Sequence, residues 1–374
     1  MSLSERAEAR CADAYKALVC VFLAGGNDSF NMLAPLSSNE YRDYASARAH
    51  LALPSSGPGA LLPVSPINAD GRSFGIHPGM PELQGLFDSG AVDFFSNVGT
   101  LVEPTTPQQF KRGATAVPEQ LLAHADQTMQ WQTSMPQMGV SSGWAGRLAD
   151  LYPSGSGPGR LPSMLISLSG QPVFMLGKHA KARPLMTSID SATQDEAGIS
   201  CRSDFPSTAL GSQLETIART IEHGRRLGLR RQVFFVQMAG WDHHHGLLHR
   251  QSQMLPVLSQ GLGAFWAALG KLGLQDNVTT FTASEFGRSL HSRASGSEHG
   301  WGGNQIVMGG ASVGKSLHGV YPETLRLGSG QDISGAGSLL PTTSTDQYFA
   351  QLLRWYGVSD SDLQVVLPNL SNFS

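Results

Sequence analysis

The hydrophobic residues of this chain gather in short runs that stop at glycine or at polar residues. The run Ala17–Ala24 is wholly apolar and ends at Gly25-Gly26, which predicts a strand buried on both faces, as in a parallel sheet. Five more runs predict strands, and they are Ala91–Asn97, Ser163–Leu168, Gln232–Met238, Asn277–Thr282 and Gln305–Met308.

Apolar residues at helical spacing lie between several of these runs. They predict helices at Gln213–Leu227, Leu255–Leu272 and Asp346–Tyr356, the last of which ends at Gly357. Alternating strands and helices are typical of βαβ units, so we expect an α/β sheet with right-handed crossovers. Ligands of such sheets bind beyond the carboxyl ends of the strands.

Composition narrows the class of protein. The 374 residues suffice for one large domain or two ordinary ones, and 40% hydrophobic with 15% charged residues describes a soluble globular protein. A net charge of −3 argues against a general nucleic-acid binder, and no run of about 18 apolar residues predicts a transmembrane helix. Three cysteines (Cys11, Cys20 and Cys201) exclude a disulfide framework and leave one disulfide open.

We expect two parts along the chain, a polar segment at 1–15 and a single α/β domain at 16–374 with long loop excursions. Met1–Tyr15 lacks the apolar middle of a secretion signal, so the residues leave open a cytoplasmic protein and an exported one whose leader is missing here. Surface loops are predicted at Pro54–Pro66, Tyr152–Pro162 and Thr187–Asp204.

Three polar segments carry the candidate chemistry. Gly25–Ser29 and Gly240–His245 follow predicted strands, and Gly296–Trp301 lies in a Gly-rich loop. All three supply carboxylate or imidazole groups, the ligand types that bind zinc and similar cations. We therefore expect folding to assemble one metal site from them.

Alternation selects residues within the second segment. In an extended loop Asp242 and His244 share one face, while His243 and His245 share the other. We favour Asp242 and His244 as ligands over a solvated polar loop. Asp28, after Gly25-Gly26, can bind the cation directly or can cap the next helix as its N-cap.

Further residues extend the candidate site. Glu298 and His299 both reach the cation if their loop curls around it, or Glu298 orients His299; a surface turn is the alternative. His124, at a predicted helix start, can contact an anion or metal or be an ordinary partly buried His. Arg288 can clamp a phosphate or sulfate, or form a structural salt bridge.

One further motif suggests a different chemistry. Gly309–Ser316 fits the spelling of a phosphate-binding loop. That loop requires a helix directly after it, and Gly319 and Pro322 interrupt any such helix. A glycine-rich turn is the preferred interpretation, and ATP binding is not expected.

Several ordered motifs resemble a bacterial family of unknown function, numbered 1501 among such domains. The resemblance runs from Tyr15 to Phe373, and its motifs are Gly25–Asp28, Gly143–Arg147, Gly240–His244, Ser284–Arg288, Glu298–Gly303 and Leu340–Thr343. The family is similar to the alkaline phosphatase superfamily, with its sulfatases and metal-dependent phosphomutases. This resemblance implies a three-layer α/β/α fold with a mostly parallel sheet, a centre of one or two metals, and export to the periplasm, often by a twin-arginine leader.

The resemblance also implies roles for individual residues. The metal ligands that it implies are Asp28, Asp242, His244, Glu298 and His299. The family usually has Asp where this chain has Glu298, and commonly Ser where it has Ala123 before His124. If that Ser were the nucleophile, Ala123 would abolish covalent catalysis, which leaves Thr128 or Ser29 as substitutes.

Two functional hypotheses follow. The first is a hydrolase that acts on a small phosphate or sulfate ester through metal-activated water, with a divalent ion (zinc, manganese or calcium) and with His124 and Arg288 as catalytic residues. The second is a degenerate, non-catalytic member that binds a ligand or a partner protein, motivated by Ala123 and Glu298. Turnover of an ester panel distinguishes them.

Overall fold

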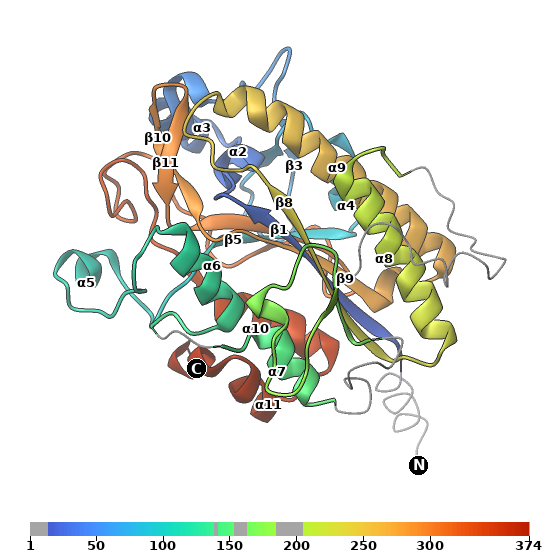
Figure 1. Cartoon of the computed structure of the whole chain (residues 1–374). Helices are drawn as coiled ribbons and strands as arrows, with labels where there is room; N and C mark the ends of the chain where they lie inside the picture. The colour runs from blue at the N-terminus through green and yellow to red at the C-terminus, as the bar shows by residue number, and fades with distance from the viewer. Residues whose placement is uncertain (1–13, 138–140, 153–162, 185–204, 374) are drawn as a thin grey trace.

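The fold is a mixed α/β structure built on one large sheet (Figure 1). The computed structural model describes residues 14–137, 141–152, 163–184 and 205–373. Its strands are β1 (Lys16–Ala24), β2 (Leu33–Pro35), β3 (Leu62–Val64), β4 (Phe74–Ile76), β5 (Val92–Gly99), β6 (Leu165–Ser167), β7 (Arg183–Pro184), β8 (Arg231–Ala239), β9 (Val278–Ala283), β10 (Gly287–Arg293), β11 (Gly296–Gly300), β12 (Gly303–Gly309), β13 (Leu317–His318) and β14 (Thr343–Ser344).

Helices connect these strands. The α-helices are α2 (Ser29–Met32), α3 (Ser38–Arg48), α4 (Pro81–Asp88), α5 (Pro107–Lys111), α6 (His124–Thr133), α7 (Trp144–Asp150), α8 (Ala209–Arg226), α9 (Leu247–Leu272), α10 (Thr345–Tyr356) and α11 (Asp360–Val366). Short 3-10 helices lie at Ala49–Leu51, Val173–Met175, Gln275–Asn277 and Pro368–Phe373. None of the helices in the described ranges is both long and apolar enough to cross a lipid bilayer.

The large sheet has the order β13-β5-β12-β9-β1-β8-β6-β7, and β14 also pairs with β5. All of its neighbouring strands are parallel except at β12, which runs antiparallel to both β5 and β9. The prediction of a mostly parallel sheet is therefore confirmed. Two smaller sheets, β10-β11 and β2-β4-β3, lie beside it.

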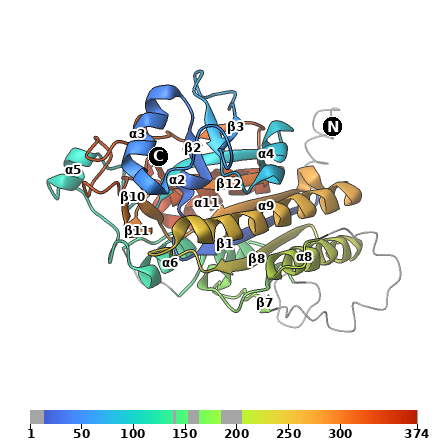
Figure 2. The ribbon, with the colours of Figure 1, turned by 90° about the horizontal axis from the view of Figure 1, so that it is seen from above.

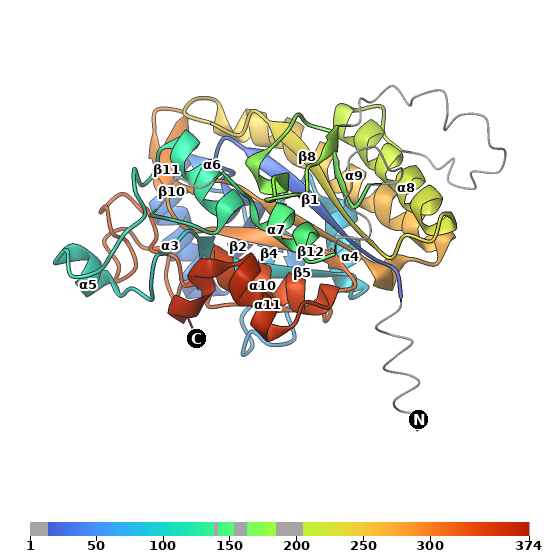
Figure 3. The same cartoon turned by 60° about the horizontal axis from the view of Figure 1, so that its bottom comes forward.

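Strand β1 shows why the fold has three layers. Its side chains alternate between two cores: Val19 and Val21 belong to the core that contains Leu214 of α8, whereas Cys20 and Phe22 belong to the core that contains Phe349 of α10. Helices α8 and α9 lie side by side on one face (Figure 2), and α7, α10 and α11 lie on the other (Figure 3). A strand covered on both faces must be apolar throughout, which is what its sequence shows.

The structure confirms the predicted strands and helices with shifted ends, and it corrects two predictions. Strand β3 (Leu62–Val64) lies within the loop predicted at Pro54–Pro66 and pairs with β4. Glu298 and His299 were expected in a Gly-rich loop, but they lie on β11, which pairs antiparallel with β10. Helix α9 also begins earlier than predicted, at Leu247, and continues through Pro256. The predicted loop at Thr187–Asp204 and most of that at Tyr152–Pro162 lie outside the described residues, as do Cys11 and Cys201.

Candidate metal centre

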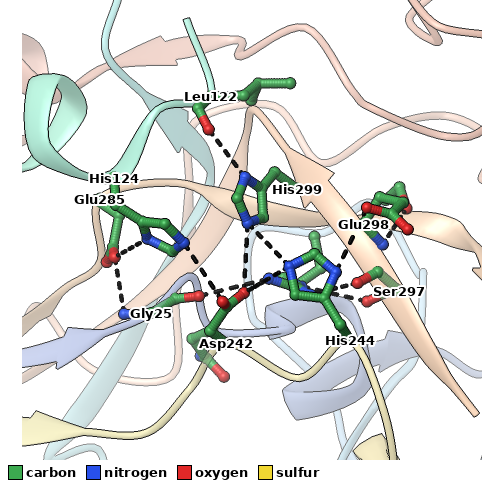
Figure 4. A network of polar contacts seen from close by, with 12 residues as sticks. Gly25, Leu122, His124, Asp242, His244, Glu285, Ser297, Glu298 and His299 are labelled. Atoms are coloured by element: carbon green, nitrogen blue, oxygen red, sulfur yellow. Dashed lines mark hydrogen bonds and ion pairs between the residues drawn. The ribbon is translucent and has the colours of Figure 1, made fainter.

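Histidine and carboxylate side chains converge at the carboxyl ends of β1, β8 and β9 (Figure 4). Asp242 and His244 come from the loop after β8, His299 from β11, and His124 is the first residue of α6. One ligand atom from each of His124, Asp242 and His299 can be chosen so that all lie within 4.8 Å of one another. The prediction that distant segments meet beyond the strand ends thus agrees with the geometry.

The Asp242 carboxylate is the centre of this group. Its Oδ1 lies 2.9 Å from His244 Nε2 and 3.3 Å from His299 Nε2, and its Oδ2 lies 3.5 Å from His124 Nε2. The Nε2 atoms of His244 and His299 are themselves 3.1 Å apart. Three imidazoles therefore direct the same ring nitrogen toward one carboxylate.

Each imidazole is held from behind through its other nitrogen. His124 Nδ1 lies 2.8 Å from Glu285 Oε1, and His299 Nδ1 lies 2.8 Å from the carbonyl oxygen of Leu122. His244 Nδ1 lies 3.4 Å from Glu298 Oε2. Acceptors behind the ring are the usual partners of metal-ligating histidines, because they fix the tautomer that leaves Nε2 free.

This hydrogen-bonding pattern leaves lone pairs facing one another. The Leu122 carbonyl can only accept, so His299 carries its hydrogen on Nδ1. Burial lowers the pKa of His299, which keeps the ring neutral at neutral pH and its Nε2 unprotonated. One proton on His244 Nε2 can satisfy Asp242 or His299, but not both.

A divalent cation between His124, Asp242 and His299, whose ligand atoms can all lie within 4.8 Å of one another, would satisfy these lone pairs, and His244 adjoins that position through Asp242 and His299. Three imidazoles and a carboxylate are ligands that zinc and other first-row metals accept, and tetrahedral sites of nitrogen and oxygen donors are typical of zinc. The residues present therefore fit a metal ion. His124, predicted as a catalytic residue, lies beside the predicted ligands Asp242, His244 and His299.

Arg288 determines the charge and position of Asp242. Partial burial raises the pKa of Asp242, but the Arg288 hydrogen bond and charge, with His244 and His124, outweigh it and lower the pKa below its usual range. Arg288 Nη1 donates to Asp242 Oδ1 at 2.6 Å, while Nη2 donates to the Ser297 carbonyl and Nε to Ser297 Oγ at 3.3 Å. The guanidinium is 1% exposed, so it contacts Asp242 rather than an incoming anion.

Asp28 lies outside the group of converging ligands. It is the N-cap residue of α2, yet its carboxylate makes no cap bond and instead pairs with Arg48 at the end of α3. Both side chains are buried, and Asp28 Oδ1 has no hydrogen-bond partner among the described residues. Asp28, predicted as a ligand, therefore does not lie among the side chains that surround Asp242.

His243 points away from its two neighbours in sequence. Its side chain is fully buried, whereas Asp242 is exposed and His244 is partly so, which agrees with the alternation predicted for these three residues. His245 is exposed, so it does not share the environment of His243 as predicted. Burial lowers the pKa of His243 to about 4, although the Asp28 charge opposes this. Neither ring nitrogen of His243 has a partner among the described residues.

Glu298 lies at the edge of the centre. Neighbouring residues of a strand point to opposite faces, so β11 cannot direct both Glu298 and His299 at Asp242. Glu298 is about half exposed, and it contacts Arg293 Nη1 at 3.2 Å as well as His244 Nδ1. One alternative from the sequence was that Glu298 orients His299. In the structure Glu298 instead lies behind the ring of His244.

The backbone of Gly25 brings β1 close to the Asp242 loop. Gly25 has φ +125°, and a Cβ there would lie 2.4 Å from the Asp242 backbone nitrogen. Its N–H donates to Glu285 Oε1 at 2.8 Å. Glu285 lies within the motif Ser284–Arg288, in which only Arg288 was assigned a role from the sequence, and Leu122 gave no signal because its contribution is a backbone carbonyl.

The loop that resembles a phosphate-binding motif surrounds an internal carboxylate. The N–H groups of Val313 and Ser316 donate to the two oxygens of Asp93 on β5 at 2.8 and 3.0 Å. His318 Nε2 lies 2.9 Å from the same carboxylate. No helix follows the loop before β13, so the preference for a turn is supported.

Comparison with known proteins places the chain in a family. The model of the protein family of unknown function DUF1501 matches residues 172–361. The chain belongs to this family. The matched range includes Asp242, His244, Glu285, Arg288 and His299. No curated protein matches the chain.

Solved structures with a similar arrangement of sheet and helices share little sequence with this DUF1501 protein. They include the PsFucS1 sulfatase from Pseudoalteromonas sp., at 8% identity and TM-score 0.40, with 96% of this chain and 70% of that chain covered. The lipoteichoic acid synthase LtaP from Listeria monocytogenes matches at 8% and 0.36, covering 84% and 68%. The C-terminal periplasmic domain of EcEptC from Escherichia coli, in complex with Zn, matches at 8% and 0.33, covering 80% and 74%.

Proposed function

We propose that this DUF1501 protein is a metal-dependent hydrolase of small phosphate or sulfate esters. The observation that carries the proposal is the convergence of three Nε2 atoms on the Asp242 carboxylate, with acceptors behind the rings. His124, Asp242, His244 and His299 would hold the metal. A bound divalent ion supplies Lewis acidity to an ester oxygen and lowers the pKa of a water.

The chain's own groups prepare this centre. Arg288 keeps Asp242 ionised and fixes one of its oxygens. The four ligand side chains are between 23% and 43% exposed, so one side of the centre is open to a substrate. Three imidazoles favour zinc over manganese and calcium, which prefer oxygen ligands.

Water, rather than a side chain, is the nucleophile in this proposal. Ala123 offers no hydroxyl beside His124. Ser29 is buried, and its Oγ accepts the Asn304 N–H at 2.7 Å, so it is committed to the core. Hydrolysis would then proceed without a covalent intermediate: the water oxygen bonds to phosphorus or sulfur as the bond to the bridging oxygen breaks. The alcohol leaves with that oxygen and takes up the proton that the water gives up.

Metal titration and ester turnover together test the proposal. Chelated protein is titrated with zinc, manganese and calcium by calorimetry, then assayed on p-nitrophenyl phosphate, bis(p-nitrophenyl) phosphate and p-nitrophenyl sulfate. We expect binding and turnover by the wild type and by Asp88→Ala, a control at an exposed carboxylate of α4. Asp242→Ala should lose more than the roughly 10- to 100-fold that loss of an outer partner costs. A wild type that binds no divalent ion refutes the proposal.

Ala123 supports a second candidate function, that of a non-catalytic member that binds a ligand or partner protein. The methyl group stands at the N-cap of α6, directly before His124, where the family commonly has a hydroxyl. A protein that binds the metal but hydrolyses none of the esters favours this candidate. Turnover that Asp242→Ala abolishes excludes it.

Export is proposed from the family resemblance. The expected compartment is the periplasm. Fractionation of the native host with an antibody to this chain tests this directly, and recovery in the cytoplasm alone would contradict it.

A further inference from the structure

The segment Ser284–Arg288, which joins β9 to the first residues of β10, supports the metal centre from behind. Arg288 holds Asp242, as described above. The ring of Phe286 lies with its centroid 4.8 Å from that of His124 and 4.5 Å from that of His299. Ser284 Oγ donates to the carbonyl oxygen of Leu23 at 2.7 Å, which fixes the segment to the end of β1.

Glu285 is the member of this segment with no assigned role. It is 4% exposed, and its Oε1 receives both the Gly25 N–H and His124 Nδ1, each at 2.8 Å. The Gly25 nitrogen can only donate, so this oxygen is an acceptor. A neutral His124 that donates from Nδ1 to an acceptor keeps its lone pair on Nε2, which faces Asp242 Oδ2 at 3.5 Å.

We infer that Glu285 is a positioning residue that holds His124 as the Nδ1–H tautomer, with Nε2 directed at the metal position. The inference rests on the proposed function insofar as a metal ion is the ligand of that Nε2. It assigns to Glu285 a role distinct from that of a structural tie between β1 and β9.

The substitution Glu285→Gln separates the two roles. The amide has nearly the same shape, and with its oxygen at the Oε1 position it still accepts both the Gly25 N–H and the His124 Nδ1–H, so a purely structural tie is preserved. The neutral amide is a weaker acceptor than a carboxylate, because hydrogen bonds to charged groups are the stronger kind. It therefore holds the Nδ1–H tautomer of His124 less firmly and makes Nε2 a weaker ligand, while the connection to β1 remains.

Zinc affinity of the full chain is the primary measurement. We expect Glu285→Gln to weaken zinc binding about 10- to 100-fold, the range for partners behind a ligating His, with an unchanged urea midpoint. Glu82→Gln is the matched control, because Glu82 also accepts a hydrogen bond, from Ser259 Oγ at 2.7 Å, on a helix that contributes no ligand. Equal zinc affinity in wild type and Glu285→Gln overturns the inference.

A double-mutant cycle tests whether Glu285 acts through His124. If it does, Glu285→Gln added to His124→Ala produces no further loss of zinc affinity. A further loss as large as in the wild-type background overturns the inference. Activity is not needed for either readout, so a protein that binds zinc but hydrolyses no ester still tests Glu285.

Histidine NMR covers the case in which Glu285→Gln does not fold. In the metal-free wild type, labelled with ¹⁵N-histidine and assigned by His124→Ala, we expect the Nδ1–H tautomer at His124. The Nε2–H tautomer overturns the inference. Wild-type protein that binds no zinc removes the proposed function but leaves this measurement interpretable.

Discussion

Replacing Arg48 with Met should destabilise the protein more than almost any surface substitution. The Arg48 side chain is fully buried, and it pairs with Asp28, whose side chain is 1% exposed. Arg48 Nη1 also donates to the carbonyl oxygens of Ser289 and Leu290 at 3.1 and 3.2 Å. Its removal leaves a carboxylate that is buried and unpaired, and such losses cost about 3–5 kcal/mol.

The double variant Arg48→Met/Asp28→Leu identifies the source of that cost. If an uncompensated Asp28 charge is the cause, removing the charge restores most of the lost free energy, because buried pairs replaced by apolar groups are often neutral. Urea unfolding of the two single variants and the double variant measures this coupling. A loss below about 1 kcal/mol in Arg48→Met would refute the reasoning.

The same variants test the predicted role of Asp28 as a ligand. With Asp28 committed to Arg48, the folded double variant should bind zinc as the wild type does. Asp276→Leu, an exchange at another carboxylate outside the centre, provides the control for the substitution itself. Loss of zinc binding by the folded double variant would show instead that Asp28 reaches the metal.

Three further predictions concern pH and backbone. Burial lowers the pKa of His77 from 6.5 to about 4, so the unfolded chain takes up this proton before the folded chain does as the pH falls. The free energy of unfolding should therefore decrease by about 3 kcal/mol as the pH is lowered from 6.5 to 4, and urea unfolding should show a smaller decrease in His77→Gln. Burial raises the pKa of Asp93, but the hydrogen bonds from His318, Ser316 and Val313 outweigh burial and lower the pKa. The stabilisation that ionised Asp93 provides should be lost as the pH falls through its folded-state pKa, and the free energy of unfolding of Asp93→Asn should depend less on pH in acid. Gly25→Ala should cost about 1–3 kcal/mol in urea and weaken zinc binding; unchanged affinity would contradict the close approach to Asp242.

Much of the fold could be predicted because runs of apolar residues indicate which segments are buried. The run Ala17–Ala24 becomes β1 almost residue for residue, and Gly357 ends α10 in the left-handed conformation that glycine favours. The direction of β12 could not be predicted, because an apolar run has the same pattern in parallel and antiparallel pairs.

In the candidate site, too, features that depend on local sequence could be predicted, whereas features that depend on tertiary packing could not. Asp242 and His244 were found through alternation, which is local. The pairing of Asp28 with Arg48 depends on where α3 packs. The opposite directions of Glu298 and His299 depend on the β10-β11 hairpin, where the glycine-rich sequence had predicted a loop. Both are tertiary facts, which the order of residues does not reveal.

The loop around Asp93 has a consequence for nucleotide binding. The N–H groups of Val313 and Ser316 already neutralise an anion that is covalently part of the chain. Such a tethered competitor is present at millimolar or higher effective concentration and cannot be diluted, so a free phosphate would have to displace it from a buried position. These hydrogen bonds connect β5 to the loop before β13, and they occupy N–H groups that a nucleotide phosphate would need.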